Sequence, residues 1–241
     1  MPFFMPSRST FLRAGLLAAG ALNSVAQAQS FCASDGQPQL TQLMERFVSA
    51  DCADCWRDAA TPAPNRHGVA LDWVVPGAQG DDAPLSAVAS RDALVRLEVL
   101  KQETPAPRRT HIQTVKAIAG ARLRVAHGLP VSDYLGASIE FRPLPRTAHP
   151  PLTAWLALVE TLPAGIEGSP VERNLVKNVL QRTWSMRKSL SKDEQNRWFE
   201  TRSMNIPPAA NPQQLRVIGW VEDAKGRILA AAQSRCLPQA H

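Results

Sequence analysis

The sequence predicts an α/β domain joined to a second, mainly antiparallel and sandwich-like β domain. Three observations carry this prediction. A Cys-x-x-Cys motif, Cys52 to Cys55, follows a strand-like run at 43–49 and precedes a short helical stretch. A strand pattern at 69–75 and a helix pattern at 84–101 come next. Beyond Pro107, apolar and polar residues alternate in short runs separated by turns, which is typical of antiparallel sheets.

The first 28 residues have the features of a secretory signal. Arg8 and Arg13 form a basic region, residues 14–22 are apolar, and Ala26-Gln27-Ala28 offers a cleavage site. Ser9 stands where a twin-arginine signal has its second arginine, so the general secretory route is favoured. No later stretch approaches the roughly 18 apolar residues that a membrane span requires. We therefore expect a periplasmic or secreted protein with no integral membrane segment after signal cleavage.

The charge distribution argues against nucleic acid as a partner. The chain has 241 residues and a formal charge of +6, which falls to +4 without residues 1–28 because only Arg8 and Arg13 are charged there. Basic and acidic residues are interspersed, as on solvated faces, and no basic stripe appears. The chain is long enough for one large domain or two small ones.

The other expected elements follow from period and turn residues. Pro62 and Pro64 end the helical stretch after the cysteines, Pro76-Gly77 ends the second strand, and Thr104 to Pro107 breaks the second helix. A hairpin is expected around the turn 223–226, with Gly226 where positive φ is needed. The strands expected after residue 107 are 111–118, 123–126, 135–141, 154–162, 197–204, 215–222 and 227–232, with another inside 174–184.

Four cysteines remain after signal cleavage, an even number that suits an oxidising compartment. Of the three connectivities, we favour Cys52 with Cys55, which leaves Cys32 to pair with Cys236. The second pair would close a loop of roughly 200 residues, which the chain-entropy model values at roughly 5 kcal/mol. Domain termini often lie close together, so this pairing is reasonable. We interpret Cys32–Cys236 as structural and Cys52–Cys55 as the candidate redox pair.

The chain resembles a family of secreted bacterial thioredoxin-like proteins of uncharacterised function. The resemblance lies in residues 45–55, the segment Arg173 to Lys177, and the closing hairpin 217–232. It implies a thioredoxin-like unit at 29–128 and a β-rich domain at 129–241, after the signal at 1–28. Thioredoxin-type sites also place a cis-proline opposite the cysteines. The matching position here lies near residues 110–113, where no proline occurs.

Three roles are open for the Cys-x-x-Cys pair. In the redox interpretation, the helix N-terminus stabilises the thiolate of Cys52, which attacks, and Cys55 resolves. In the structural interpretation, the pair is a tight disulfide. In the metal interpretation, Cys52 and Cys55 would need a further ligand such as His111, since the sequence has no second Cys-x-x-Cys and no paired-histidine motif. We predict no metal and no cofactor.

The function expected is a thiol–disulfide redox role at Cys52 and Cys55 in a secreted thioredoxin-like protein, a candidate oxidoreductase. Its partners would be protein thiols or disulfides in the cell envelope. The alternative is a non-catalytic envelope protein, for binding or structure, whose cysteines form two structural disulfides. No nucleophile elbow, P-loop, dinucleotide motif or zinc-protease motif points to another chemistry.

Overall fold

The structure is a computed structural model that describes residue 1 and residues 32–144, 147–185 and 197–236. Strands dominate these residues, and α-helix is confined to two short segments, α1 at Ala53–Arg57 and α2 at Arg91–Val99. Within these ranges no helix is long and apolar enough to cross a bilayer. Single 3-10 turns occur at Gly80–Asp82, Ser86–Val88, Ile166–Gly168 and Pro212–Gln214.

The strands form two sheets. The seven-stranded sheet has the order β11-β10-β7-β8-β3-β2-β4 and the five-stranded sheet has the order β12-β1-β5-β6-β9. Strand β2 runs parallel to β3, and β3 joins β8 in parallel at Asp72 and Leu175, while the other pairs are antiparallel. The large sheet comprises β2 Gln42–Ser49, β3 Gly68–Val75, β4 Arg108–Thr114, β7 Leu152–Leu162, β8 Arg173–Trp184, β10 Leu215–Glu222 and β11 Ile228–Gln233. The small sheet comprises β1 Cys32–Ala33, β5 Arg122–Val131, β6 Tyr134–Arg142, β9 Trp198–Asn205 and β12 Arg235–Cys236.

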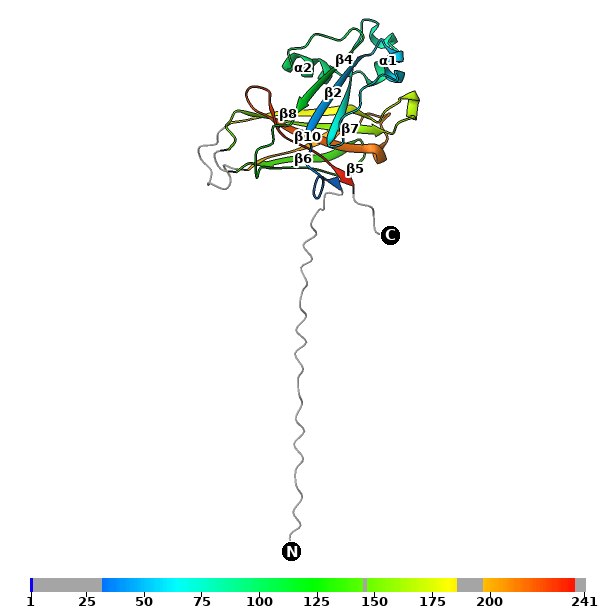
Figure 1. Ribbon diagram of the computed structural model, residues 1–241. Coiled ribbons are helices and arrows are strands. Elements are labelled where there is room, and N and C mark those ends of the chain that lie inside the picture. Colours follow the sequence, from blue (N-terminus) through cyan, green and yellow to red (C-terminus); the bar gives the residue numbers. More distant parts are fainter. Residues whose placement is uncertain (2–31, 145–146, 186–196, 237–241) are drawn as a thin grey trace.

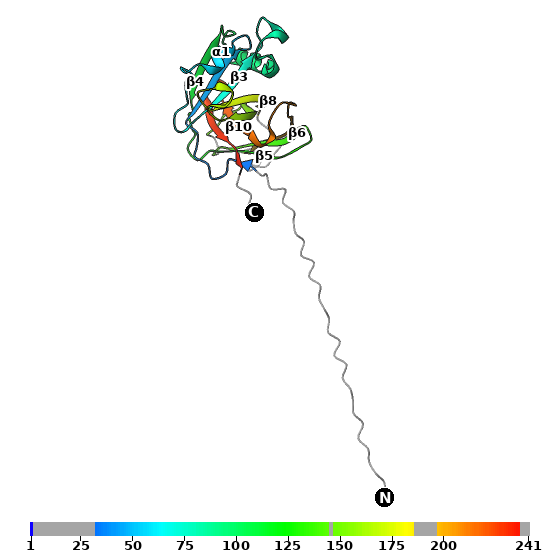
Figure 2. The ribbon, with the colours of Figure 1, turned by 90° about the vertical axis from the view of Figure 1, so that its right-hand side faces the viewer.

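Strand β7 is buried along almost its whole length because both of its faces are covered. Leu156 and Leu158 belong to the core between the two sheets, together with Val125 and Ile139 of the small sheet. Trp155 and its alternate neighbours point to the opposite face, where α2 packs. Both views show the small sheet on the side of the molecule away from α1 and α2 (Figures 1 and 2).

The predicted fold class is wrong: the molecule is not an α/β thioredoxin-like domain joined to a separate β domain. The strands on either side of the Cys-x-x-Cys motif belong to a mixed sheet that continues through β8, β7, β10 and β11. Sequence periodicity identifies individual strands, but the pairing of β3 with β8 across about a hundred residues leaves no local pattern. Strand β5 runs through residues 128–129, where we placed the domain boundary. The division into 29–128 and 129–241 stays a prediction.

The predicted helix at 84–101 is also wrong in extent. A 3-10 turn at Ser86–Val88 comes first, and extended backbone at Ala89 and Ser90 separates it from α2. The Ser90 side chain accepts a hydrogen bond from the backbone N–H of Asp92, so it is the N-cap that starts α2. The ten predicted strand runs overlap the ten strands from β2 to β11, although β4 begins and ends earlier than the predicted run at 111–118.

Candidate functional site

A surface hollow of about 830 Å³ lies beside the Cys-x-x-Cys motif. Three segments form its walls: residues 51–54 at the start of α1, residues 76–78 after β3, and residues 104–107 before β4. The volume lies in the range of sites that hold small molecules or peptide side chains. Prolines and alanines supply much of the lining, so the hollow is partly apolar.

The two cysteines of the motif form a disulfide with an S–S distance of 2.07 Å. Cys52 occupies the N-cap position of α1 and is half-buried, whereas Cys55 is 7% exposed. Cys52 lines the hollow and Cys55 does not. Any reagent that enters the hollow therefore meets the Cys52 side of the disulfide first.

Asp51 joins two walls of the hollow. Its carboxylate accepts hydrogen bonds from the backbone N–H groups of Ala78 (2.7 Å) and Gln79 (3.2 Å). Gly77 allows this approach, because a Cβ at that position would overlap the Asp51 carboxylate. Asp51 thus holds the loop after β3 against the start of α1.

The third wall contains a cis-proline. The peptide bond from Ala106 to Pro107 is cis, and Pro107 lies directly before β4 and lines the same hollow as Cys52. The Pro107 carbonyl accepts a hydrogen bond from the backbone N–H of Ser49 (2.9 Å). Residues 110–113, where a thioredoxin-type site would have its proline, lie inside β4, which begins at Arg108, and the cis-proline stands directly before that strand.

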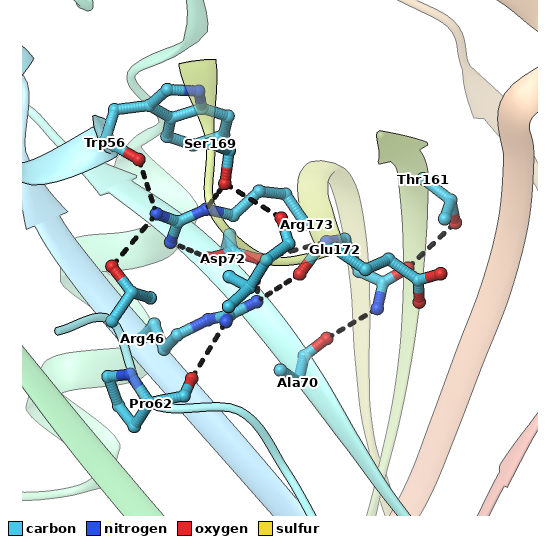
Figure 3. Close-up of polar contacts among 12 residues, drawn as sticks. Arg46, Trp56, Pro62, Ala70, Asp72, Thr161, Ser169, Glu172 and Arg173 are labelled. Carbon is cyan, nitrogen blue, oxygen red and sulfur yellow. Dashed lines mark hydrogen bonds and ion pairs between the residues drawn. The ribbon is translucent and has the colours of Figure 1, made fainter. Parts of the chain in front are cut away.

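A buried charge cluster contacts α1 through Trp56 (Figure 3). Arg46 of β2 and Arg173 of β8 both donate to the carboxylate of Asp72 on β3, at 2.7 and 2.9 Å. The side chains of all three residues are at most 3% exposed. One carboxylate therefore binds two guanidinium groups and links three strands of the large sheet.

Arg173 also fastens the helix that carries the motif. Its Nη2 donates to the carbonyl oxygen of Trp56 (2.7 Å), and its guanidinium lies 4.6 Å from the Trp56 ring centroid (Figure 3). Its Nε donates to the hydroxyl of Ser169 (2.8 Å). Burial lowers the pKa of the Arg173 guanidinium below its ordinary value, although Asp72 acts in the opposite direction.

A second buried cluster fastens α2. Arg96 donates to both carboxylate oxygens of Glu45 (2.8 Å each) and pairs with Glu222 (2.8 Å). Its guanidinium lies over the rings of Trp155 and Trp220, at 4.7 and 5.2 Å from their centroids. Burial alone would lower the pKa of Arg96, but the two carboxylates outweigh it and raise the pKa above its ordinary value. The side chains of this cluster are buried in the core.

The other disulfide joins Cys32 to Cys236 (S–S 2.01 Å), across a sequence separation of 204. Both disulfides therefore have the predicted connectivity, and no described cysteine is free. At the level of bonding, this agrees with the interpretation in which all four cysteines form disulfides. The hypothetical metal set of Cys52, Cys55 and His111 is not found, since the metal-ligating groups of the described residues do not include it.

Arg46, Asp72 and Arg173 were not predicted from the sequence to form a unit. Asp72 and Arg46 each interrupt an otherwise apolar or strand-like run, and such charges inside buried strands are a usable signal. Their convergence depends on the register of β2, β3 and β8, which the sequence does not reveal.

Comparisons with known proteins show a likeness of fold alone. No protein-family model matches the chain, and no curated protein matches it. A solved structure, HBP35 of Porphyromonas gingivalis, has a TM-score of 0.50 and 10% sequence identity. The likeness covers 84% of this chain and 77% of that one. At 10% sequence identity, the comparison shows a similar fold and gives no information on function.

Proposed function

We propose that this chain is a non-catalytic binding protein of the cell envelope, whose hollow beside Cys52 holds an extended segment of a partner protein. Both disulfides stabilise the fold in this proposal. The observation that carries it is the hollow's continuity with an open sheet edge through Pro107. The envelope location rests on the signal-like features of residues 1–28, of which all but residue 1 lie outside the described residues.

Strand β4 offers unpaired backbone groups to such a segment. It ends the seven-stranded sheet and pairs only with β2 among the described strands. Because Pro107 bonds to β2, the alternation of an antiparallel ladder turns the backbone groups of Arg108, Thr110 and Ile112 outward. An extended peptide can add to such an edge as a further strand. The side chain of Ile112 is 52% exposed and adds apolar surface beside that edge.

The Cys52–Cys55 disulfide has a structural task in this proposal. Helix α1 has five residues and no side-chain hydrogen bond at its N-cap. A helix of that length is unstable without tertiary contacts. The disulfide closes its first turn, and Arg173 holds its end through Trp56. Together they keep one wall of the hollow in place.

The test is a substitution that blocks the edge and spares the fold. Thr110→Pro removes an outward N–H and puts a pyrrolidine ring against an incoming strand, whereas Thr110→Ala leaves the edge open. The probe is a phage-displayed pool of linear peptides. We expect enrichment on the parent protein and on Thr110→Ala, and about a ten-fold weaker affinity on Thr110→Pro. Equal affinity on the two variants, or no enrichment on the parent, would overturn the proposal.

A second test fills the hollow itself. Ala78 is exposed and lines the hollow, so Ala78→Trp places a large ring there without disturbing the core. Peptides enriched on the parent should bind this variant at least about ten-fold more weakly, since the ring occupies their place. Unchanged binding would show that the peptides dock elsewhere.

Thiol–disulfide exchange is the second candidate, and the unequal exposure of the two cysteines favours it. A thiolate that enters the hollow could attack the Cys52 sulfur and release the Cys55 thiolate. A second partner thiol would then attack the mixed disulfide, leaving the protein reduced and the partner oxidised to its disulfide. A half-buried Cys52 that lines the hollow, with Cys55 buried, suits this order of events.

Insulin reduction in the presence of a dithiol separates the two candidates. Exchange predicts that the parent accelerates insulin precipitation, that Cys55→Ala accumulates an adduct through Cys52, and that Cys52→Ala does neither. The binding role predicts no acceleration by the parent. The binding role also predicts that the double variant Cys52→Ala/Cys55→Ala still binds peptides. This variant cannot take part in thiol–disulfide exchange at the motif, because it lacks both sulfurs.

A further inference from the structure

The Cys32–Cys236 disulfide has a histidine beside it. Strands β12, β1 and β5 lie next to one another, and their register places Cys32 opposite Cys236 on one side and opposite His127 on the other. A ring nitrogen of His127 and the two sulfur atoms all lie within 4.8 Å of one another. Three adjacent strands thus bring two sulfurs and one imidazole to a single point.

The hydrogen bonding of His127 fixes which of its ring nitrogens carries the proton. The residue is 4% exposed, and its Nδ1 lies 3.0 Å from the carbonyl oxygen of Gly128. A carbonyl can only accept, so Nδ1 carries the proton and Nε2 carries a lone pair. Nε2 is buried and has no hydrogen-bond partner. Histidines that bind metals commonly donate their other ring N–H to such a carbonyl.

The site is also accessible from outside. Cys236 is exposed and lines a hollow of about 660 Å³, together with His67 and Glu172. Cys32 and His127 are buried behind it. A small ion or a reductant can therefore reach Cys236 from the hollow without unfolding the sheet.

We propose that reduction of the Cys32–Cys236 disulfide creates a zinc site formed by both cysteine thiolates and His127. Two molecules of a thiol reductant supply the two electrons and leave as their own disulfide. Zn²⁺ then displaces one proton from each cysteine and binds two sulfurs and Nε2. A fourth position faces the hollow for water or another ligand. This inference is independent of the hollow beside Cys52.

The donor set selects the ion. Thiolate and imidazole suit Zn²⁺, whereas Mg²⁺ and Ca²⁺ require oxygen ligands. After reduction, the two sulfurs need only move apart far enough to bind one ion between them. The pairing of β12, β1 and β5 keeps them close to each other. The metal would replace the disulfide as the link between the two ends of the described chain.

The experiment uses the full chain with Cys52→Ser/Cys55→Ser, so that the only thiols are those of the site. The protein is reduced with a water-soluble phosphine, which becomes its oxide, and is then titrated with Co²⁺ as a visible substitute for Zn²⁺. We expect one Co²⁺ per chain, with thiolate charge-transfer bands and the strong visible absorption of tetrahedral cobalt. Zn²⁺ should displace it, and the oxidised protein should bind none.

Variants of two histidines isolate the role of His127. His127→Ala should weaken Co²⁺ binding at least about ten-fold, as loss of a ligand or its orienting partner does. His111→Ala is the matched control, because His111 also has a buried Nε2 without a partner but is not in this group. Its affinity should not change. If His127→Ala folds poorly, His127→Cys tests the same position and should add thiolate absorption. Equal binding by reduced and oxidised protein, or full affinity in His127→Ala, would overturn the proposal.

Discussion

Asp72 shows what one buried carboxylate does in this molecule. It accepts from two guanidinium groups, and its Oδ2 also accepts from the backbone N–H of Asn174 (2.9 Å). Replacing a whole buried ionic cluster by apolar residues can be neutral, but removing one partner leaves an uncompensated charge. The cluster therefore links β3 to both of its neighbours, β2 and β8, and single substitutions in it should be costly.

The first prediction concerns Arg173. Arg173→Met keeps a long apolar side chain but leaves Asp72 with one cation and the Trp56 carbonyl without its donor. We expect the free energy of unfolding to fall by about 3–5 kcal/mol. Arg182→Met, on the same strand, breaks an exposed pair with Glu200 and should cost less than about 1 kcal/mol. Urea unfolding of both variants measures the difference, and similar losses would contradict this account of the cluster.

The second prediction concerns Gly77. Its φ is ordinary, so the need for glycine comes from the Asp51 carboxylate that occupies the place of a Cβ. Gly77→Ala should displace that carboxylate and weaken two hydrogen bonds to the loop, at a cost of about 1–3 kcal/mol. Gly136→Ala is the control, because a Cβ there meets nothing within 4 Å. Thermal unfolding compares the two, and equal stability would show that Asp51 does not hold the loop.

At the scale of elements, local sequence signals located strands well and their ends less well. The predicted run at 123–126 ends before His127, and Gly128 and Pro130 follow. In the structure β5 continues to Val131, and its register with β6 shifts between His127 and Pro130. A bulge accommodates a proline that a regular central strand would exclude. The predicted helix at 84–101 was too long, because the apolar spacing continues across Ser90. Ser90 is the residue that caps the N-terminus of α2.

The third prediction follows from that cap. Ser90→Ala removes the acceptor of the Asp92 backbone N–H and should destabilise the protein by about 1 kcal/mol. Ser86→Ala lies in the preceding 3-10 turn, where the hydroxyl donates to an exposed carbonyl, and should cost less. Chemical denaturation of the two variants provides the comparison. A larger loss in Ser86→Ala would mean that the 3-10 turn, and not the cap, determines where α2 begins.

At the scale of the whole molecule, the sequence indicated the cysteine pairing but not the topology. Cysteine count and the nearness of chain ends sufficed for the pairing, because few connectivities exist. The Cys-x-x-Cys strands join the large mixed sheet where Asp72 lies opposite Leu175 and pairs with Arg173. The close packing of the two sheets also requires a glycine at position 219, since a Cβ there would overlap Val125 of the small sheet. Such contacts join residues a hundred positions apart, and period-based reasoning does not reach them.

The fourth prediction compares the two disulfides by the chain each one closes. In the chain-entropy model, Cys32–Cys236 removes far more freedom from the unfolded chain than Cys52–Cys55 does, and the two contributions are about 5 and about 2 kcal/mol. The double variant Cys32→Ser/Cys236→Ser should therefore unfold at a clearly lower denaturant concentration than Cys52→Ser/Cys55→Ser, both measured with a metal chelator present.

The small sheet explains why the larger loss of stability should affect the whole molecule. Strands β1 and β12 have two residues each and attach to the rest through β5, so without their covalent link the chain ends have few contacts to hold them. If instead Cys52→Ser/Cys55→Ser were the less stable variant, α1 and the walls of the hollow would be the part of the fold on which the rest depends.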